Sequence, residues 1–152
     1  MGLLRWKNLR WVVVFAVVIQ LVPFGRDHTN PAEMQEPAWD SAQTRALAKR
    51  ACFDCHSNTT TWPWYSNIAP VSWLTQRDVN GGRQHLNFSE WGKPQRHAGD
   101  AVTEVRGGDM PPWFYLPMHP DARLSDAEKA ALMAGLQKTP GLQEVADHEG
   151  GH

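Results

Sequence analysis

Cysteine is scarce in this chain: only two occur in 152 residues, at Cys52 and Cys55. A disulfide framework needs more cysteines, and a structural zinc site usually takes four Cys or His ligands in paired spacings. A thioredoxin-like dithiol needs a βαβ context, which the sequence does not show. Strand signals are weak as well, because alternation is absent and β-branched residues are sparse beyond the N-terminal segment. The sequence therefore predicts an all-α fold.

The two cysteines open the pentapeptide Cys52-Phe53-Asp54-Cys55-His56. This C-x-x-C-H pattern is typical of c-type haem attachment. Two thiols at this spacing form thioethers to the two vinyl groups of one porphyrin, and the next residue offers an imidazole to the iron. We therefore expect one covalent haem c per chain, held by Cys52, Cys55 and His56. A non-haem dithiol or metal module remains the alternative.

The sixth iron ligand separates electron transfer from ligand chemistry. Met110 is our candidate, because it lies in the segment Gly107–Pro112, where two prolines restrict the backbone. Ligation by Met and His raises the potential of a haem. Met118 and His119 are rivals in another proline-bounded segment, and His119 is the alternative ligand. His85 and His97 are weaker candidates still.

No acidic residue occurs among the first 26 residues, where Arg5, Lys7 and Arg10 precede an apolar run from Trp11 to Phe24. Basic followed by apolar residues is the start of a secretory signal, but no A-x-A-like cleavage site follows. The run is shorter than the roughly 20 residues that span a bilayer comfortably, although flanking basic side chains can snorkel. We predict an uncleaved signal anchor, or transmembrane segment, at residues 1–26.

Charge divides the chain into two parts. Residues 1–26 carry four Lys or Arg, whereas residues 27–152 carry 11 basic and 16 acidic residues. The acidic balance of the second part argues against binding to nucleic acid. We expect a tether at residues 27–39, one haem-binding domain at 40–140 and a flexible tail at 141–152.

Helix signals recur through the domain. Asp40 or Ser41 caps the first expected helix, and Ser125 with Glu128 forms a capping box at the start of the last. Proline and glycine mark the other boundaries. The expected helices run from about residue 41 to 51, from 70 to 81–82, from 95 to 106, and from 125 to before Pro140.

Several further motifs occur in a fixed order. They are Cys52–Asn58 (C-x-x-C-H-S-N), Trp62–Ser66 (W-P-W-Y-S), Ala69–Trp73, Asn87–Ser89 with Trp91, Met110–Pro112 (M-P-P), and His119-Pro120 before Leu124-Ser125. On these motifs the chain, from about Pro31 to Thr139, resembles a family of small bacterial haem-binding domains related to monohaem cytochromes c. The resemblance implies a cytochrome c-like helical domain around one covalent haem, exported and tethered to a membrane, with Met110 as sixth ligand.

The expected function is that of a membrane-tethered monohaem c-type cytochrome, which carries single electrons and is not an enzyme. Positive residues before the apolar run predict a single-pass protein of the bacterial cytoplasmic (inner) membrane, with its haem domain on the periplasmic side. The expected partners are the membrane, through the N-terminal helix, and a redox protein that the sequence does not identify. The alternative is a haem-based gas sensor or haem enzyme with an open or displaceable sixth iron site.

Overall fold

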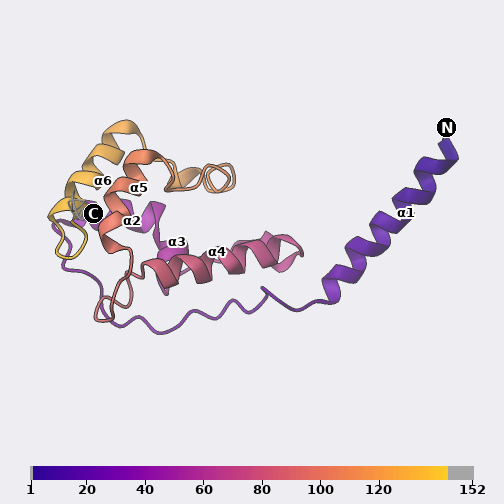
Figure 1. Cartoon of the computed structure of the whole chain (residues 1–152), viewed down its shortest axis with the longest axis horizontal. Helices are drawn as coiled ribbons and strands as arrows, with labels where there is room; N and C mark the ends of the chain where they lie inside the picture. Colours follow the sequence, from indigo (N-terminus) through magenta and orange to yellow (C-terminus); the bar gives the residue numbers. More distant parts are fainter. Residues whose placement is uncertain (1, 144–152) are drawn as a thin grey trace, which may run out of the picture.

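The structure is a computed structural model that describes residues 2–143, with side chains from residue 8 onward. Helices make up its regular structure, and among the described residues the only β pairing is one isolated bridge between Gln35 and Glu90. The predicted all-α fold is therefore confirmed. The α-helices are α1 (Gly2–Val18), α2 (Ala42–Ala51), α3 (Phe53–His56), α4 (Val71–His85), α5 (Ala101–Gly107) and α6 (Asp126–Lys138) (Figure 1). Short 3-10 turns connect them, named η1 (Ile19–Leu21), η2 (Trp64–Asn67), η3 (Ala98–Asp100) and η4 (Pro120–Ala122).

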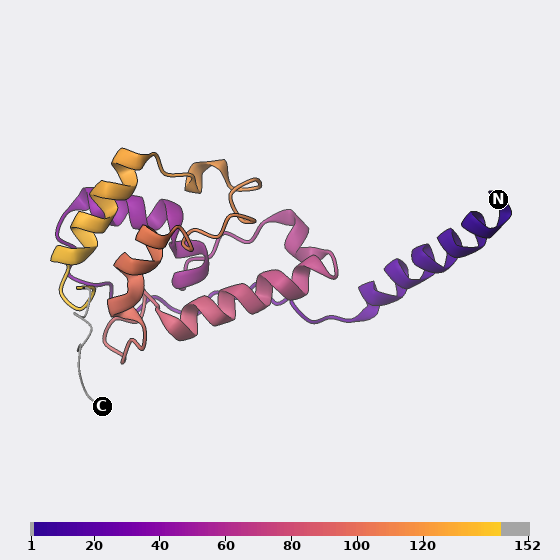
Figure 2. The same cartoon turned by 45° about the horizontal axis from the view of Figure 1, so that its top comes forward.

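The N-terminal helix α1 projects away from the other helices, beyond the N-terminal end of α4 (Figures 1 and 2). It has 17 residues and passes into the 3-10 turn η1. Among residues 2–143, no helix is long and apolar enough to cross a membrane. The structure thus shows a helix in the region that the sequence predicted as an anchor.

The segment predicted as a tether is extended and lies along the helical domain. The amide N–H groups of Met34 and Gln35 donate to the Ser89 carbonyl at 2.9 and 3.1 Å, and the Trp91 N–H donates to Gln35 O at 2.9 Å. The Asn30 side chain donates to Thr60 O at 2.9 Å. Backbone pairing therefore fixes this segment to the domain.

The first and last helices of the domain begin where their caps predict. The Ser41 hydroxyl accepts from the Thr44 N–H at the start of α2, and Ser125 and Glu128 form the complete capping box of α6. The two helices cross at Gly135, where a Cβ would lie within 3 Å of the Thr44 side chain. A side chain at position 135 would separate α2 from α6.

Two predicted helix boundaries are wrong. Helix α4 continues through Gly81 and Gly82 to His85, because Gly82 packs against the backbone of Cys55 instead of ending the helix. The third helix begins at Ala101 instead of about residue 95, since the chain first makes the turn η3. Its predicted stop is correct: Gly108 has φ 82°, a left-handed conformation that suits glycine.

One hydrophobic core joins α2, α3, α5 and α6. Its most deeply buried members include Phe88, Val102, Leu132 and Leu136. Leu142 is also fully buried, so the core extends past residue 140 into the region predicted as a tail. The rest of that predicted tail, residues 144–152, lies outside the described residues.

Candidate haem site

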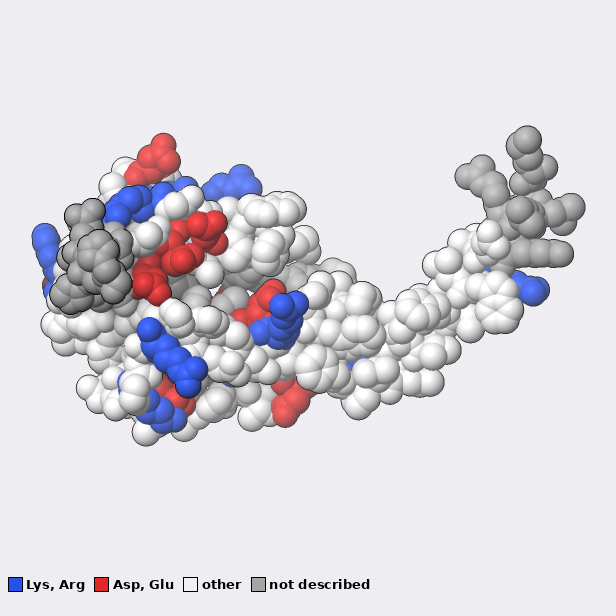
Figure 3. Space-filling model, viewed as in Figure 1, with Lys and Arg blue, Asp and Glu red and all other residues white. Residues whose placement is uncertain are grey.

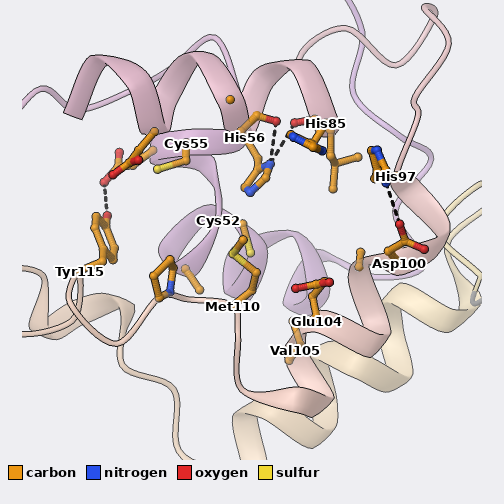
Figure 4. A pocket seen from close by; sticks show the side chains of 18 of the residues that line it. Cys52, Cys55, His56, His85, His97, Asp100, Glu104, Val105, Met110 and Tyr115 are labelled. Carbon is orange, nitrogen blue, oxygen red and sulfur yellow. Dashed lines mark hydrogen bonds and ion pairs between the residues drawn. The ribbon is translucent and has the colours of Figure 1, made fainter. Parts of the chain in front are cut away.

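A cavity of about 850 Å³ lies between α3 and α4 on one side and α5 with the following loop on the other (Figure 4). Its volume falls in the range of about 300–1,000 Å³ that is usual for cofactor and small-molecule sites. Cys52, Cys55, His56 and Met110 all line this cavity. The structure thus brings together the four residues predicted to hold a haem, although Met110 is far from the others in sequence.

The pentapeptide is presented to the cavity by a break between two helices. Cys52 is the C-cap of α2, and α3 begins at Phe53, whose ring is buried in the core. The fixed ring of Phe53 orients α3 so that both thiols and the imidazole of His56 reach the cavity wall. Cys52 and Cys55 are not joined by a disulfide.

Burial raises the pKa values of both thiols. The pKa of Cys52 rises to about 12, from burial and then from the charge of Cys55. The pKa of Cys55 rises to about 11, from burial first and then from the Asp54 and Asp78 carboxylates. Because the thiolate is the redox-active form of cysteine, these shifts disfavour a reactive dithiol. In the described part of the chain, no group of three or more His, Cys, Asp or Glu side chains is placed to hold a metal ion.

The imidazole of His56 is held by its Nδ1 atom. That nitrogen lies 3.0 Å from Gly82 O and 3.0 Å from Leu86 O. A carbonyl oxygen only accepts, so Nδ1 carries the proton and the lone pair belongs to Nε2, which faces the cavity (Figure 4). Metal-binding histidines are commonly held in this way, by a backbone carbonyl on the other ring nitrogen. Burial also lowers the pKa of His56, which favours the neutral, ligating form.

Gly82 makes this arrangement possible. A Cβ at position 82 would lie 2.5 Å from Cys55 O and 2.9 Å from the Cys55 carbonyl carbon. Only glycine lets α4 approach α3 so closely, and the close approach delivers the carbonyl that receives the His56 N–H. Gly82 and Leu86 are site residues that the sequence analysis missed, because a backbone carbonyl leaves no residue-type signal.

Met110 reaches the cavity from the wall opposite His56 (Figure 4). Its backbone N–H donates to Glu104 O at 3.2 Å, and the Asp109 N–H donates to the same oxygen at 3.1 Å. The loop is therefore pinned to the last turn of α5. The Met110 side chain is half-buried and packs against the core. A thioether thus faces an imidazole across the cavity, and these are the two side chains that the sequence analysis predicts would hold the haem iron.

The rival ligand His119 is occupied elsewhere. Its Nε2 atom lies 2.5 Å from the Tyr65 hydroxyl, and its ring stacks on Tyr115 with centroids 3.8 Å apart. Tyr115 in turn donates its hydroxyl proton to Asp54 Oδ2 at 2.6 Å. Tyr115 lines the cavity but His119 does not. The geometry therefore favours Met110 over His119, and Met118 is exposed to solvent.

His85 and His97, set aside as weak ligand candidates, line the cavity at the end away from Tyr115 (Figure 4). Their rings lie 4.7 Å apart, and His97 Nδ1 is 2.8 Å from Asp100 Oδ2. Glu104 lines the same end. No sequence pattern pairs these residues, since they come from the end of α4 and the turn before α5.

Aromatic residues contribute less to the cavity than the tryptophan content suggests. Phe88, Phe114 and Tyr115 line it, whereas no described tryptophan does. Trp64 and Trp113 are instead exposed.

The cavity fits a haem on the chemistry of its lining: paired thiols, an imidazole with a free Nε2, and a facing thioether. A sequence model described as a haem-binding domain matches residues 14–138. The chain belongs to this haem-binding domain family. No curated protein and no solved structure matches the chain significantly.

Proposed function

We propose that this protein is a monohaem c-type cytochrome that carries single electrons and is not an enzyme. The observation that carries the proposal is the His56 imidazole, fixed by two carbonyls through Nδ1 and facing Met110 across a cavity that both cysteines line. A haem bound there supplies a one-electron Fe(III)/Fe(II) couple. The protein residues hold, orient and shield that couple.

Each residue has a distinct role in the proposal. Cys52 and Cys55 form the thioether bonds, so that one haem c is attached covalently per chain. His56 is the proximal ligand through Nε2, and the Gly82 and Leu86 carbonyls hold its ring and favour electron donation from Nε2. Met110 is the sixth ligand, and its thioether raises the reduction potential relative to a second histidine.

We also propose that the domain is exported and remains tethered to the bacterial cytoplasmic membrane through residues 1–26, with the haem domain on the periplasmic side. The support is the basic-then-apolar N-terminal sequence and the exposed apolar side chains along α1. Covalent haem attachment on the outer face of that membrane agrees with export. The electron-transfer partner is a second redox protein.

Intact-mass spectrometry and carbon monoxide binding together test the proposal. The full chain, produced with haem-attachment machinery, should carry the mass of one haem, and Cys52→Ser/Cys55→Ser should lose it. Carbon monoxide should bind the reduced protein slowly or not at all, because Met110 already occupies the sixth position. An unmodified mass would contradict haem attachment, and fast stoichiometric binding would instead indicate a sensor or enzyme with an open sixth site.

A further inference from the structure

Exposed hydrophobic side chains are segregated on this molecule. Outside α1 and the residues directly after it, the exposed large hydrophobic residues come almost entirely from two places: η2 with the start of α4, and the loop between Pro112 and His119. Trp113 is 80 % exposed and Trp64 is 70 % exposed. We call this surface the apolar end; it consists of Trp64, Ile68, Val71, Leu74, Trp113, Phe114 and Met118. Of the described residues beyond it and the α1 segment, only Met34 is a large exposed hydrophobic.

The two parts of the apolar end are joined by specific contacts. The hydroxyl of Tyr65, the residue after Trp64, is 2.5 Å from His119 Nε2. The ring of His119 also stacks on Tyr115, in the same loop as Trp113. These contacts hold the loop beside η2, so the exposed aromatic groups form one surface.

The chain leaves the domain for α1 at this same end. The Gln20 side chain donates to Ala69 O at 2.9 Å and accepts from Ala69 N–H at 3.0 Å. Arg26 donates to Gln20 Oε1 at 3.0 Å, which fixes the amide in place. A Cβ on Gly25 would lie 2.2 Å from Ser72 O, so the segment after α1 runs tightly against the first turn of α4.

Charge is distributed in the opposite sense. On the face drawn in Figure 3, Lys, Arg, Asp and Glu side chains gather mainly over the part of the domain distant from α1, and residues 11–18 of α1 carry no charged side chain. Leu21 and Phe24, directly after α1, are also exposed. Apolar surface therefore continues from α1 through its junction onto the domain.

We propose that the apolar end lies against the surface of a lipid bilayer. Tryptophan is enriched where a protein meets the membrane–water interface, because its ring is amphipathic, and contiguous exposed apolar surface marks an interaction site. The continuity with α1 favours lipid over a protein partner, since any bilayer that holds α1 also meets this end of the domain. The inference rests on the proposed membrane tether. Phe114 belongs both to the apolar end and to the lining of the haem cavity. One edge of the cavity therefore lies beside the bilayer.

Photo-crosslinking in the membranes of cells that express the full haem-loaded chain tests this orientation. Benzoylphenylalanine replaces one residue at a time: Trp64 or Trp113 in the apolar end, Phe15 in α1, and Met34 as the control. Met34 is matched because it is 68 % exposed and apolar but lies outside the apolar end. Mass spectrometry then separates lipid adducts from protein adducts.

The expected result is a lipid adduct at positions 64, 113 and 15, and no lipid adduct at position 34. A lipid adduct at position 15 alone would overturn the orientation while retaining the tether. No lipid adduct at position 15, 64 or 113 would overturn both. Protein adducts at 64 and 113 without lipid would show that the apolar end binds a protein.

Discussion

The two walls of the cavity hold their ligands in different ways. On one wall, the His56 imidazole itself is hydrogen-bonded, with Nδ1 3.0 Å from each of two carbonyls, those of Gly82 in α4 and of its C-cap residue Leu86. On the other wall, the loop of Met110 is held through its backbone, with the Asp109 and Met110 N–H groups donating to Glu104 O. The thioether has no comparable restraint, and methionine is unbranched and flexible. The comparison teaches that the proposed proximal ligand is fixed by a helix, whereas the proposed sixth ligand depends on a loop and on packing.

Removing the fixed ligand should have the largest effect. We expect His56→Ala to abolish the low-spin haem spectrum, because His56 is the imidazole that the Gly82 and Leu86 carbonyls hold toward the cavity. Absorption spectroscopy of the purified variant checks this. His28→Ala is the matched control, since His28 stacks on Trp62 at 4.6 Å, outside the cavity, and should leave the spectrum unchanged. A normal spectrum in His56→Ala would place the proximal ligand elsewhere.

Removing the loop-held ligand should have a narrower effect. We expect Met110→Ala to retain covalent haem, to lower the reduction potential and to bind carbon monoxide readily when reduced, because only the sixth position is opened. Redox titration and carbon monoxide difference spectra measure both changes. Met118→Ala is the control, as Met118 is exposed and should affect neither. Equal reduction potentials and equal carbon monoxide binding in the two variants would show that Met110 is not the sixth ligand.

A change behind the fixed ligand tests why that wall is rigid. Gly82→Ala places a Cβ 2.5 Å from Cys55 O, and overpacking of this kind costs about 1–3 kcal/mol. We expect lower thermal stability and a weaker hold on His56, seen as ligand exchange in the spectrum. Gly81→Ala is the control, because a Cβ there meets no atom within 4 Å and adds only helix propensity, worth about 1 kcal/mol. Similar losses in both variants would contradict the packing argument.

The smallest effect concerns the helix behind the Met110 wall. The Ser125 N–H and hydroxyl and Arg50 together lower the pKa of Glu128, in the capping box of α6, to about 2. A lowered folded-state pKa contributes stability that is present above the ordinary value of 4.5 and is lost as pH falls toward 2. The midpoint temperature of thermal unfolding should therefore fall between pH 5 and pH 2. This fall should be smaller in Glu128→Gln. An equal fall of the midpoint temperature in the variant would show that the Glu128 carboxylate does not cause this pH dependence.

The sequence predicted the side chains that line the site better than the backbone contacts that hold them. Cys52, Cys55 and His56 are adjacent, so their pattern alone indicated haem attachment, and Met110 was placed by the loop that carries it. The carbonyls that hold His56 come from residues 26 and 30 positions downstream. No local pattern encodes that contact, which depends on how α4 packs on α3.

Helix boundaries were likewise predicted where they depend on local interactions and not where they depend on tertiary contacts. The caps at Ser41 and Ser125 were read correctly because a cap is a local interaction. The prediction that the second helix stops at Gly81 and Gly82 is wrong, because Gly82 packs against Cys55 and the helix continues to His85. The exposed positions of Trp64 and Trp113 were also not predicted, since a tryptophan-rich sequence fits a cofactor pocket and a surface patch equally well.

The most direct test of the account is the optical spectrum of the full chain, produced with haem-attachment machinery, in the oxidised and then the reduced state and into the near infrared. We predict a low-spin haem with a weak near-infrared sulfur-to-iron band in the oxidised form, as ligation by His56 and Met110 requires. A low-spin spectrum without that band would transfer the sixth position to a nitrogen ligand such as His119. A high-spin spectrum, or no haem absorption, would contradict the electron-carrier account.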